Sequence, residues 1–146
     1  MNSVNIYQGT FRECVAISKN IPEFDSPYDL VEYKKRCYGI HLTFIAEIHH
    51  KPVGFKVGYD RFQDGSFYSW MGGVLPDFRN QGIANALADH QENWAKENGF
   101  NSVNLKTRKK HKAMIQFSLN RGFVITEEIE MKPVEETRVW MEKSLI

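Results

Sequence analysis

Residues 74–84 constrain the fold of this chain more than any other stretch, because they combine a strand end, a tight bend and a helix start. Aromatic and apolar residues at 67–71 precede the bend, which is the pattern of a buried strand. A helix starting near Ile83 leaves about four backbone N–H groups without intrahelical partners, at the positive end of its dipole. Gly82 allows close approach to these groups, so the bend predicts a phosphate-binding site.

A glycine in a strand–turn–helix segment can also serve backbone geometry alone, so the surrounding motif carries the argument. The pattern Arg79-x-x-Gly82-x-Ala84, preceded by Val74-Leu75-Pro76, resembles the acetyl-CoA signature of the GNAT superfamily of N-acetyltransferases. Farther along, Gly122-Phe123 resembles the Gly-Phe pair that opens the strand after the fourth helix in that superfamily. The resemblance extends over nearly the whole chain, and it implies the superfamily's fold and its cofactor.

The composition is that of an ordinary globular domain, with 42% hydrophobic and 25% charged residues. A length of 146 residues predicts a single domain over residues 1–146. The net charge of +1 argues against nucleic acid or a membrane surface as a general partner. No apolar run approaches the roughly 20 residues of a membrane span. Residues 1–6 lack the layout of a signal peptide, so we expect a cytoplasmic protein.

The two cysteines, Cys14 and Cys37, fall in segments with helical patterns and lack Cys-x-x-Cys spacing. We expect buried thiols without a catalytic role. No spacing of His, Cys or carboxylate residues indicates a metal site, so we expect none.

The pattern along the chain predicts an α/β (α+β) fold with a mixed sheet of about seven strands and about four helices. The expected order is β-α-α-β-β-β-α-β-α-β-β, as the resemblance implies. Thr10 and Glu13 form a capping-box pattern, Ser26-Pro27 predicts a second helix start, and Gly99 suits a helix end. We expect strands at 4–7, 41–48, 53–61, 67–75, 103–107, 123–125 and 138–141, and helices at 10–19, 26–38, 82–98 and 112–119.

Helical spacing also predicts which side chains face the core. The inward residues expected in the helix at 82–98 are Ile83, Leu87, His90, Trp94 and Ala95. In the helix at 112–119 the expected inward residues are Met114, Ile115 and Leu119, together with Phe117. Residues 49–52 are expected to form the turn between two antiparallel strands.

The GNAT resemblance implies that acetyl-CoA lies along the fourth strand, in a wedge where the fourth and fifth strands separate. Adjacent glycines, Gly72 and Gly73, are unfavourable inside a strand and mark either close backbone approach or a bulge. The pyrophosphate is then expected on the main-chain amides of residues 80–84. The implied cofactor-binding residues are Gly73, Val74, Leu75, Arg79, Asn80, Gln81, Gly82, Ile83 and Ala84.

Chemistry in the superfamily is direct attack of an amine on the thioester, and the resemblance assigns the oxyanion to the amide of Val74. Many members protonate the leaving thiolate with a Tyr at the position of Ser118. A Ser hydroxyl is a far weaker acid, although it can relay a proton through water. An Asn common in the superfamily is replaced by His111, which is the alternative contact to the thiol.

The general base is equally open, because Tyr68 stands where some members carry a catalytic Glu. An alkylamine with a pKa of about 10 must lose its proton before it attacks. Tyr68 and Ser118 are therefore the catalytic candidates, and core packing is the alternative role of Tyr68. Glu47 and Asp60 are further carboxylates without positional support.

Two charged segments bear on ligands. Residues 22–29 carry acidic and aromatic side chains that would suit a cationic amine. The alternative is that Asp25 and Asp29 only cap the following helix. Residues 107–112 are basic, which suits the phosphates of CoA, a nucleic-acid patch or a solvated loop. Acidic residues at 127–136 partly balance this cluster in a terminal hairpin that offers an edge to a second subunit in a homodimer.

The sequence therefore predicts an acetyl-CoA-dependent N-acetyltransferase that acts on an amine of a small molecule or a peptide. The main alternative is a non-catalytic acyl-CoA-binding module, because the usual Tyr is replaced by Ser118. A nucleic-acid-binding domain is a third interpretation, which the net charge of +1 opposes.

Overall fold

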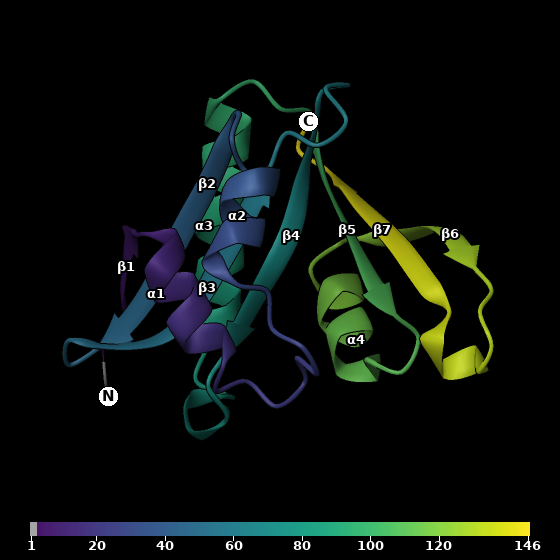
Figure 1. Cartoon of the computed structure of the whole chain (residues 1–146). Coiled ribbons are helices and arrows are strands. Elements are labelled where there is room, and N and C mark those ends of the chain that lie inside the picture. The colour runs from purple at the N-terminus through teal and green to yellow at the C-terminus, as the bar shows by residue number, and fades with distance from the viewer. Residues whose placement is uncertain (1–2) are drawn as a thin grey trace. The chain divides into compact units, whose positions relative to one another are not determined.

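The computed structural model describes residues 3–146, which form seven strands, four α-helices and two short 3-10 helices (Figure 1). This order of strands and helices confirms the expected one. The elements are β1 (Asn5–Gln8), α1 (Phe11–Ser18), α2 (Leu30–Arg36), β2 (His41–Ile48), β3 (Lys51–Tyr59), β4 (Ser66–Val74), η1 (Pro76–Phe78), α3 (Ile83–Glu97), β5 (Ser102–Arg108), α4 (Lys112–Asn120), β6 (Val124–Ile129), η2 (Val134–Glu136) and β7 (Arg138–Ser144).

The strands are hydrogen-bonded in the order β1-β2-β3-β4-β5-β7-β6, and the sheet is mixed. β4 and β5 pair in parallel, with Ser66–Tyr68 opposite Ser102–Asn104, whereas β1–β2, β2–β3, β5–β7 and β6–β7 pair antiparallel. The two parallel strands are joined by a crossover connection that contains α3, as expected for parallel neighbours. The α/β fold class predicted from the sequence is confirmed.

The chain divides into two compact units. One comprises the residues up to Asp60 together with Ser69–Trp94, and the other comprises Arg61–Tyr68 together with Ala95–Ile146. The single domain expected over residues 1–146 stays a prediction. Within residues 3–146, no helix is both long and apolar enough to cross a membrane. The expected cytoplasmic location and the homodimer also stay predictions.

In the first unit, helices cover both faces of the sheet, as Gly54 and Phe55 of β3 show. Successive strand residues point to opposite faces. A Cβ added at Gly54 would lie 3.3 Å from Leu87 Cδ1 of α3. The ring of Phe55 instead meets Phe24, between α1 and α2, with the ring centroids 6.3 Å apart. α3 therefore packs on one face of β3, and the α1–α2 segment packs on the other.

The start of α1 is as predicted, because Thr10 is its N-cap and forms a capping box with Glu13. The start of α2 is not. The helix begins after Asp29, whose carboxylate accepts a hydrogen bond from the Glu32 amide at 3.0 Å, and Ser26 and Pro27 lie before it. A carboxylate cap placed three residues before an acidic residue explains why the helix starts later than the Ser-Pro signal indicated.

The turn between β2 and β3 is tighter than the expected four residues. It consists of His49 and His50, which both have positive φ angles of 50° and 65°. Two left-handed residues between antiparallel strands are typical of a type I′ hairpin. Pro52 therefore belongs to β3, where it lies opposite Glu47 beside a register irregularity that accommodates the missing N–H.

The buried face of α3 is rotated from the expected one. Its fully buried residues are Ile83, Leu87, Ala88, Gln91 and Ala95. The expectation for His90 was wrong, since His90 is exposed, and Trp94 is half-buried. A polar residue, Gln91, lies on the buried face of α3, and the spacing of apolar residues alone does not indicate it.

The C-terminal segment differs from expectation in two places. Leu119 is exposed rather than inward, and Ser118 is the buried residue of α4. β6 continues to Ile129, beyond the expected end at residue 125, and all six of its residues are exposed. An edge strand without a buried face carries little periodicity, so its length could not be recognised from the pattern.

Both cysteines are buried, Cys14 in α1 and Cys37 as the C-cap of α2. Burial raises the pKa of each thiol to about 12, which keeps both protonated at neutral pH. Protonated, inaccessible thiols are poor nucleophiles, in keeping with the expected structural role.

Candidate active site

The turn that leads into α3 has the conformation of an anion-binding loop. Asn80 and Gly82 are both left-handed, with φ angles of 62° and 81°. No carbonyl among residues 3–146 accepts a hydrogen bond from the backbone amides of residues 80–84. The first amide that bonds into the helix is that of Ala86, which donates to Gly82 O at 3.0 Å. A row of unused N–H groups at the start of a 15-residue helix is suited to a phosphate.

The surface of this turn is open to solvent. Asn80, Gln81, Gly82 and Ala84 are exposed, while Ile83 is buried and anchors the turn. A Cβ added at Gly82 would meet nothing within 4 Å. The glycine is therefore explained by its positive φ and by the open space over its backbone, rather than by packing.

The two glycines near the end of β4 have a different explanation. A Cβ at Gly73 would lie 2.6 Å from Ile21 Cδ1, and one at Gly72 would lie 3.3 Å from Phe55 O. Tight packing within the chain thus accounts for the missing side chains. The close approach of a ligand to Gly73 stays a prediction.

The peptide group between Val74 and Leu75 is fixed at both ends. The Leu75 amide donates to Val53 O at 2.8 Å, and Arg79 Nε donates to Val74 O at 3.1 Å. A cofactor could bind the Leu75 amide only by displacing the first bond. The end of β4 is therefore held in one orientation by its own chain.

Arg79 ties this strand end to the α1–α2 connection. Its Nη2 and Nη1 donate to the two carboxylate oxygens of Glu23, at 2.7 and 3.0 Å. These hydrogen bonds to Glu23 raise the pKa of the guanidinium, which stays charged at every accessible pH. Sequence reasoning assigned Arg79 to the cofactor, whereas its side chain here binds Glu23 and Val74. We infer that Arg79 positions the turn whose amides are free.

Ser118, the candidate acid, lies in α4 with its side chain almost fully buried. Its Oγ donates to Met114 O at 2.9 Å, one helical turn earlier. To pass a proton to a thiolate, the hydroxyl would have to leave this bond. His111 is the N-cap residue of the same helix. The catalytic role of Ser118 stays a prediction.

Tyr68, the candidate base, lies on β4 and is 2% exposed. Its ring packs against Trp140 with the centroids 5.8 Å apart, and the Arg61 guanidinium lies 4.8 Å above it. Packing accounts for the residue, and its role as a base stays a prediction.

The acidic loop expected beside the acceptor is largely engaged within the chain. Glu23 binds Arg79 and Asp29 caps α2, and in the helix that follows Glu32 pairs with Arg36 at 2.8 Å. The capping role considered for Asp29 is therefore the observed one. A cationic acceptor would have to compete with these partners.

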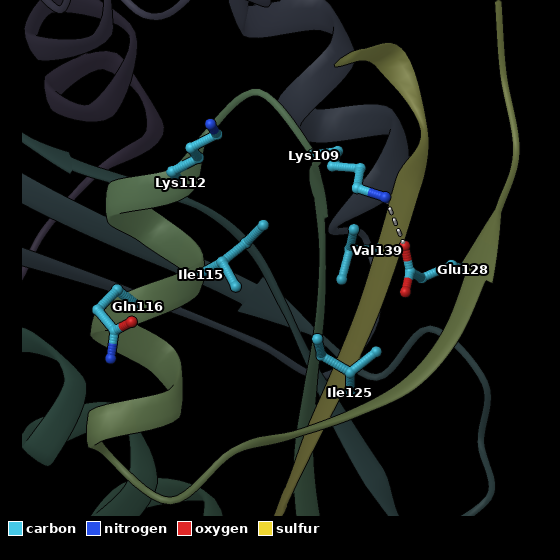
Figure 2. A pocket seen from close by; sticks show the side chains of 7 residues that line it. All are labelled: Lys109, Lys112, Ile115, Gln116, Ile125, Glu128 and Val139. Atoms are coloured by element: carbon cyan, nitrogen blue, oxygen red, sulfur yellow. Dashed lines mark ion pairs between the residues drawn. The ribbon is translucent and has the colours of Figure 1, made fainter. Parts of the chain in front are cut away.

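The basic segment at 107–112 is bound to the terminal hairpin. Arg108 and Lys110 both pair with Glu136, at 3.0 and 3.3 Å. Figure 2 shows the pair of Lys109 with Glu128, at 3.5 Å. These ion pairs are partly exposed and individually weak. Two carboxylates of the acidic hairpin thus partly offset the positive charge of the cluster, which leaves less of that charge for CoA phosphates or nucleic acid. Among residues 3–146, no group of His, Cys and carboxylate side chains is arranged to hold a metal.

Comparison with known proteins relates the chain to one family. Residues 5–123 match the family model described as "Acetyltransferase (GNAT) family". A protein named as an acetyltransferase from Pectobacterium atrosepticum is 36% identical over 97 residues, which cover 66% of this chain and 62% of that relative. The match thus spans less than two thirds of the relative's length.

Solved structures share the fold at low identity. The ribosomal-protein-S18-alanine N-acetyltransferase of Escherichia coli superposes with a TM-score of 0.83 at 16% identity, over 98% of this chain and 94% of that one. A protein from Bacillus anthracis, solved in complex with acetyl coenzyme A, superposes with a TM-score of 0.77 at 18% identity, over 97% and 98% of the two chains. These likenesses support the fold.

The two roles of Arg79 can be separated by stability measurements. Glu23→Gln removes a partly exposed ion pair, so we expect a loss of less than about 1 kcal/mol in the free energy of unfolding. Arg79→Ala also removes the donor to Val74 O, so we expect a loss larger by about 1 kcal/mol. Urea unfolding of both variants and of the double variant provides the comparison. Equal losses in the two single variants would show that the bond to Val74 contributes nothing.

Proposed function

Because the chain belongs to the acetyltransferase (GNAT) family, we propose that it transfers an acetyl group from acetyl-CoA to a primary amine of a small molecule or peptide. The observation that carries the proposal is the row of free amides at residues 80–84, exposed at the start of α3. Main-chain donors at a helix N-terminus suit the pyrophosphate of the cofactor. The motif that resembles the acetyl-CoA signature, from Arg79 to Ala84, lies in this same segment.

In this proposal the pyrophosphate binds the amides of residues 80–84 and the pantetheine arm follows the backbone of Gly73 and Val74. Arg79 contributes by holding the turn, since both ends of its guanidinium group are already occupied. A turn that is fixed before the ligand arrives loses little conformational entropy on binding. The Arg79–Glu23 pair and the bond to Val74 O would supply that preorganisation.

The chemical step joins the amine nitrogen to the acetyl carbon and breaks the bond between that carbon and sulfur. The amine must be neutral when it attacks, and its second proton leaves as the tetrahedral intermediate collapses. We propose the Val74 amide as a donor to the oxyanion. Tyr68 is the proposed base and Ser118 the proposed relay of a proton to the departing thiolate.

A non-catalytic acyl-CoA-binding module is the second candidate, and one observation favours it. The Ser118 hydroxyl is buried and already donates to Met114 O, so no acid is poised in α4 at that position. The free amides of residues 80–84 would serve such a module equally well. Turnover separates the two candidates.

The direct test of the activity is thiol release from acetyl-CoA with a panel of polyamines, amino acids, aminoglycosides and peptides with free amines. We expect release that depends on one acceptor class and on the protein concentration. Binding of acetyl-CoA without release, across the whole panel, would favour the module over the enzyme. Absence of binding would contradict both.

The cofactor site is tested by placing a carboxylate at Gly82. We expect Gly82→Glu to raise the Kd of acetyl-CoA at least about 100-fold, because charge and bulk meet the pyrophosphate. Gly99→Glu is the matched control. Gly99 follows the other end of α3, has a φ of 87°, and also has open space where a Cβ would be added. Both variants place a side chain at a positive φ, so backbone strain is present in each and only Gly82→Glu should lose binding by calorimetry. Equal affinities would refute the site.

The proton relay is tested with Ser118→Ala, for which Ser18→Ala is the control. Ser18 is also a buried helical serine, and its Oγ donates to Val15 O at 2.8 Å. If Ser118 relays the proton, its removal lowers kcat at least about tenfold and leaves the Kd of acetyl-CoA unchanged. The control should keep the kcat of the native protein. An unchanged kcat in Ser118→Ala would assign the residue to packing alone.

A further inference from the structure

β6 offers a free strand edge in the second unit. It is the last strand in the hydrogen-bonding order, and within residues 3–146 its only neighbour is β7. All six residues of β6 are exposed. Along an edge strand, part of the N–H and C=O groups point away from the neighbour and can pair with another chain. β6 is therefore a template for an added strand.

A groove of about 330 Å³ lies on the face of β6 that looks toward α4 (Figure 2). Ile115 of α4, Ile125 of β6 and Val139 of β7 form its apolar part. Lys109, Lys112, Gln116 and Glu128 complete the lining, and the Lys109–Glu128 pair closes one side. Its chemistry suits an apolar side chain.

A second groove, of about 340 Å³, has the opposite character. Its lining includes the rings of Phe62 and Trp140 and no Lys or Arg, and it is completed by Asp64, Asn104, Thr126, Glu127 and Glu142. Two of its three carboxylates are held in place. Asp64 accepts bonds from Ser66 N and Oγ at 2.9 and 2.5 Å, and Glu142 accepts one from Ser102 Oγ at 2.9 Å. Fixed carboxylates beside aromatic faces attract a cationic side chain.

The Trp140 ring already contacts two cations of its own chain. Arg61 Cζ and Lys106 Nζ lie 5.6 and 5.5 Å from the ring centroid. Neither cation lines the groove, and a partner's cation would reach the carboxylates of Glu127 and Glu142 from outside.

The two grooves lie on opposite faces of the same strand. Ile125 and Glu128 line the first groove, whereas Thr126 and Glu127 line the second. Side chains alternate along a strand, and the register irregularity between Ile125 and Glu127 places two neighbours on one face. A strand added beside β6 would therefore direct alternate side chains into an apolar groove and an acidic one.

We propose that β6 binds an extended segment of another protein in which basic and apolar residues alternate. Main-chain hydrogen bonds to the edge would give the segment its affinity, and the two grooves would select its side chains. A second copy of β6 fits poorly, because it would bring its own Glu127 to the groove that Asp64, Glu127 and Glu142 already make acidic. This surface is independent of the proposed active site, so its test does not depend on acetyl transfer.

The test uses a capped six-residue peptide of alternating lysine and valine, with a glutamate–valine peptide as the control. We expect the lysine peptide to shift the amide resonances of residues 124–129 in the full-length protein, and to bind at least about tenfold more tightly than the control. Methylation of alternate backbone nitrogens on its pairing edge should abolish the shifts. Glu127→Lys should weaken binding at least about fivefold, whereas Glu97→Lys, an equal charge change on α3, should not.

Several outcomes would overturn the proposal. Equal affinity for the two peptides would remove the acidic groove as the selecting feature. Binding that survives backbone methylation would exclude strand addition. A dimer in sedimentation experiments that is lost in Glu127→Lys, or that blocks the peptide, would show that a second copy occupies the edge.

Discussion

The bidentate ion pair between Arg79 and Glu23 is the interaction on which the proposed cofactor site depends. One guanidinium group joins the α1–α2 connection, the last carbonyl of β4 and the turn that begins α3. The opposite side of the Val74–Leu75 peptide is held by β3 through Val53 O. Each of these bonds is modest in energy, but together they leave the turn little freedom. The free amides of residues 80–84 are thereby presented in one arrangement.

This arrangement separates binding from chemistry within the molecule. The proposed binding elements are main-chain groups, which would allow ordinary side chains such as Asn80 and Gln81 in the turn, while Gly82 suits its left-handed φ of 81°. The catalytic candidates are side chains with packing roles of their own. Tyr68 lies against Trp140, and Ser118 bonds to its own helix. The structure therefore says less about the acceptor and the catalytic residues than about the proposed cofactor site.

Much of the fold could be predicted from local signals. The capping box of Thr10 and the glycine at Gly99 marked helix ends correctly, and the motif from Arg79 to Ala84 marked the turn into α3. The failures have physical causes. Asp29 rather than Ser26 caps α2, and Gln91 rather than His90 lies on the buried face of α3.

Contacts between distant positions could not be predicted. Arg79 and Glu23 are 56 positions apart, and nothing in one sequence pairs an arginine with a particular carboxylate at that separation. The same holds for the basic segment at 107–112, whose charges meet Glu128 and Glu136 in the terminal hairpin. From its composition alone a charged segment resembles a ligand site, and only the fold shows which of its charges form ion pairs within the chain.

The most direct test of the proposed phosphate turn compares coenzyme A with pantetheine, which lacks the phosphates, by their effects on backbone amide resonances. We predict that coenzyme A shifts the amides of residues 80–84 strongly and that pantetheine leaves them in place. Equal shifts with both ligands, or shifts from coenzyme A confined to residues outside this turn, would contradict the claim that the free amides at the start of α3 bind the pyrophosphate.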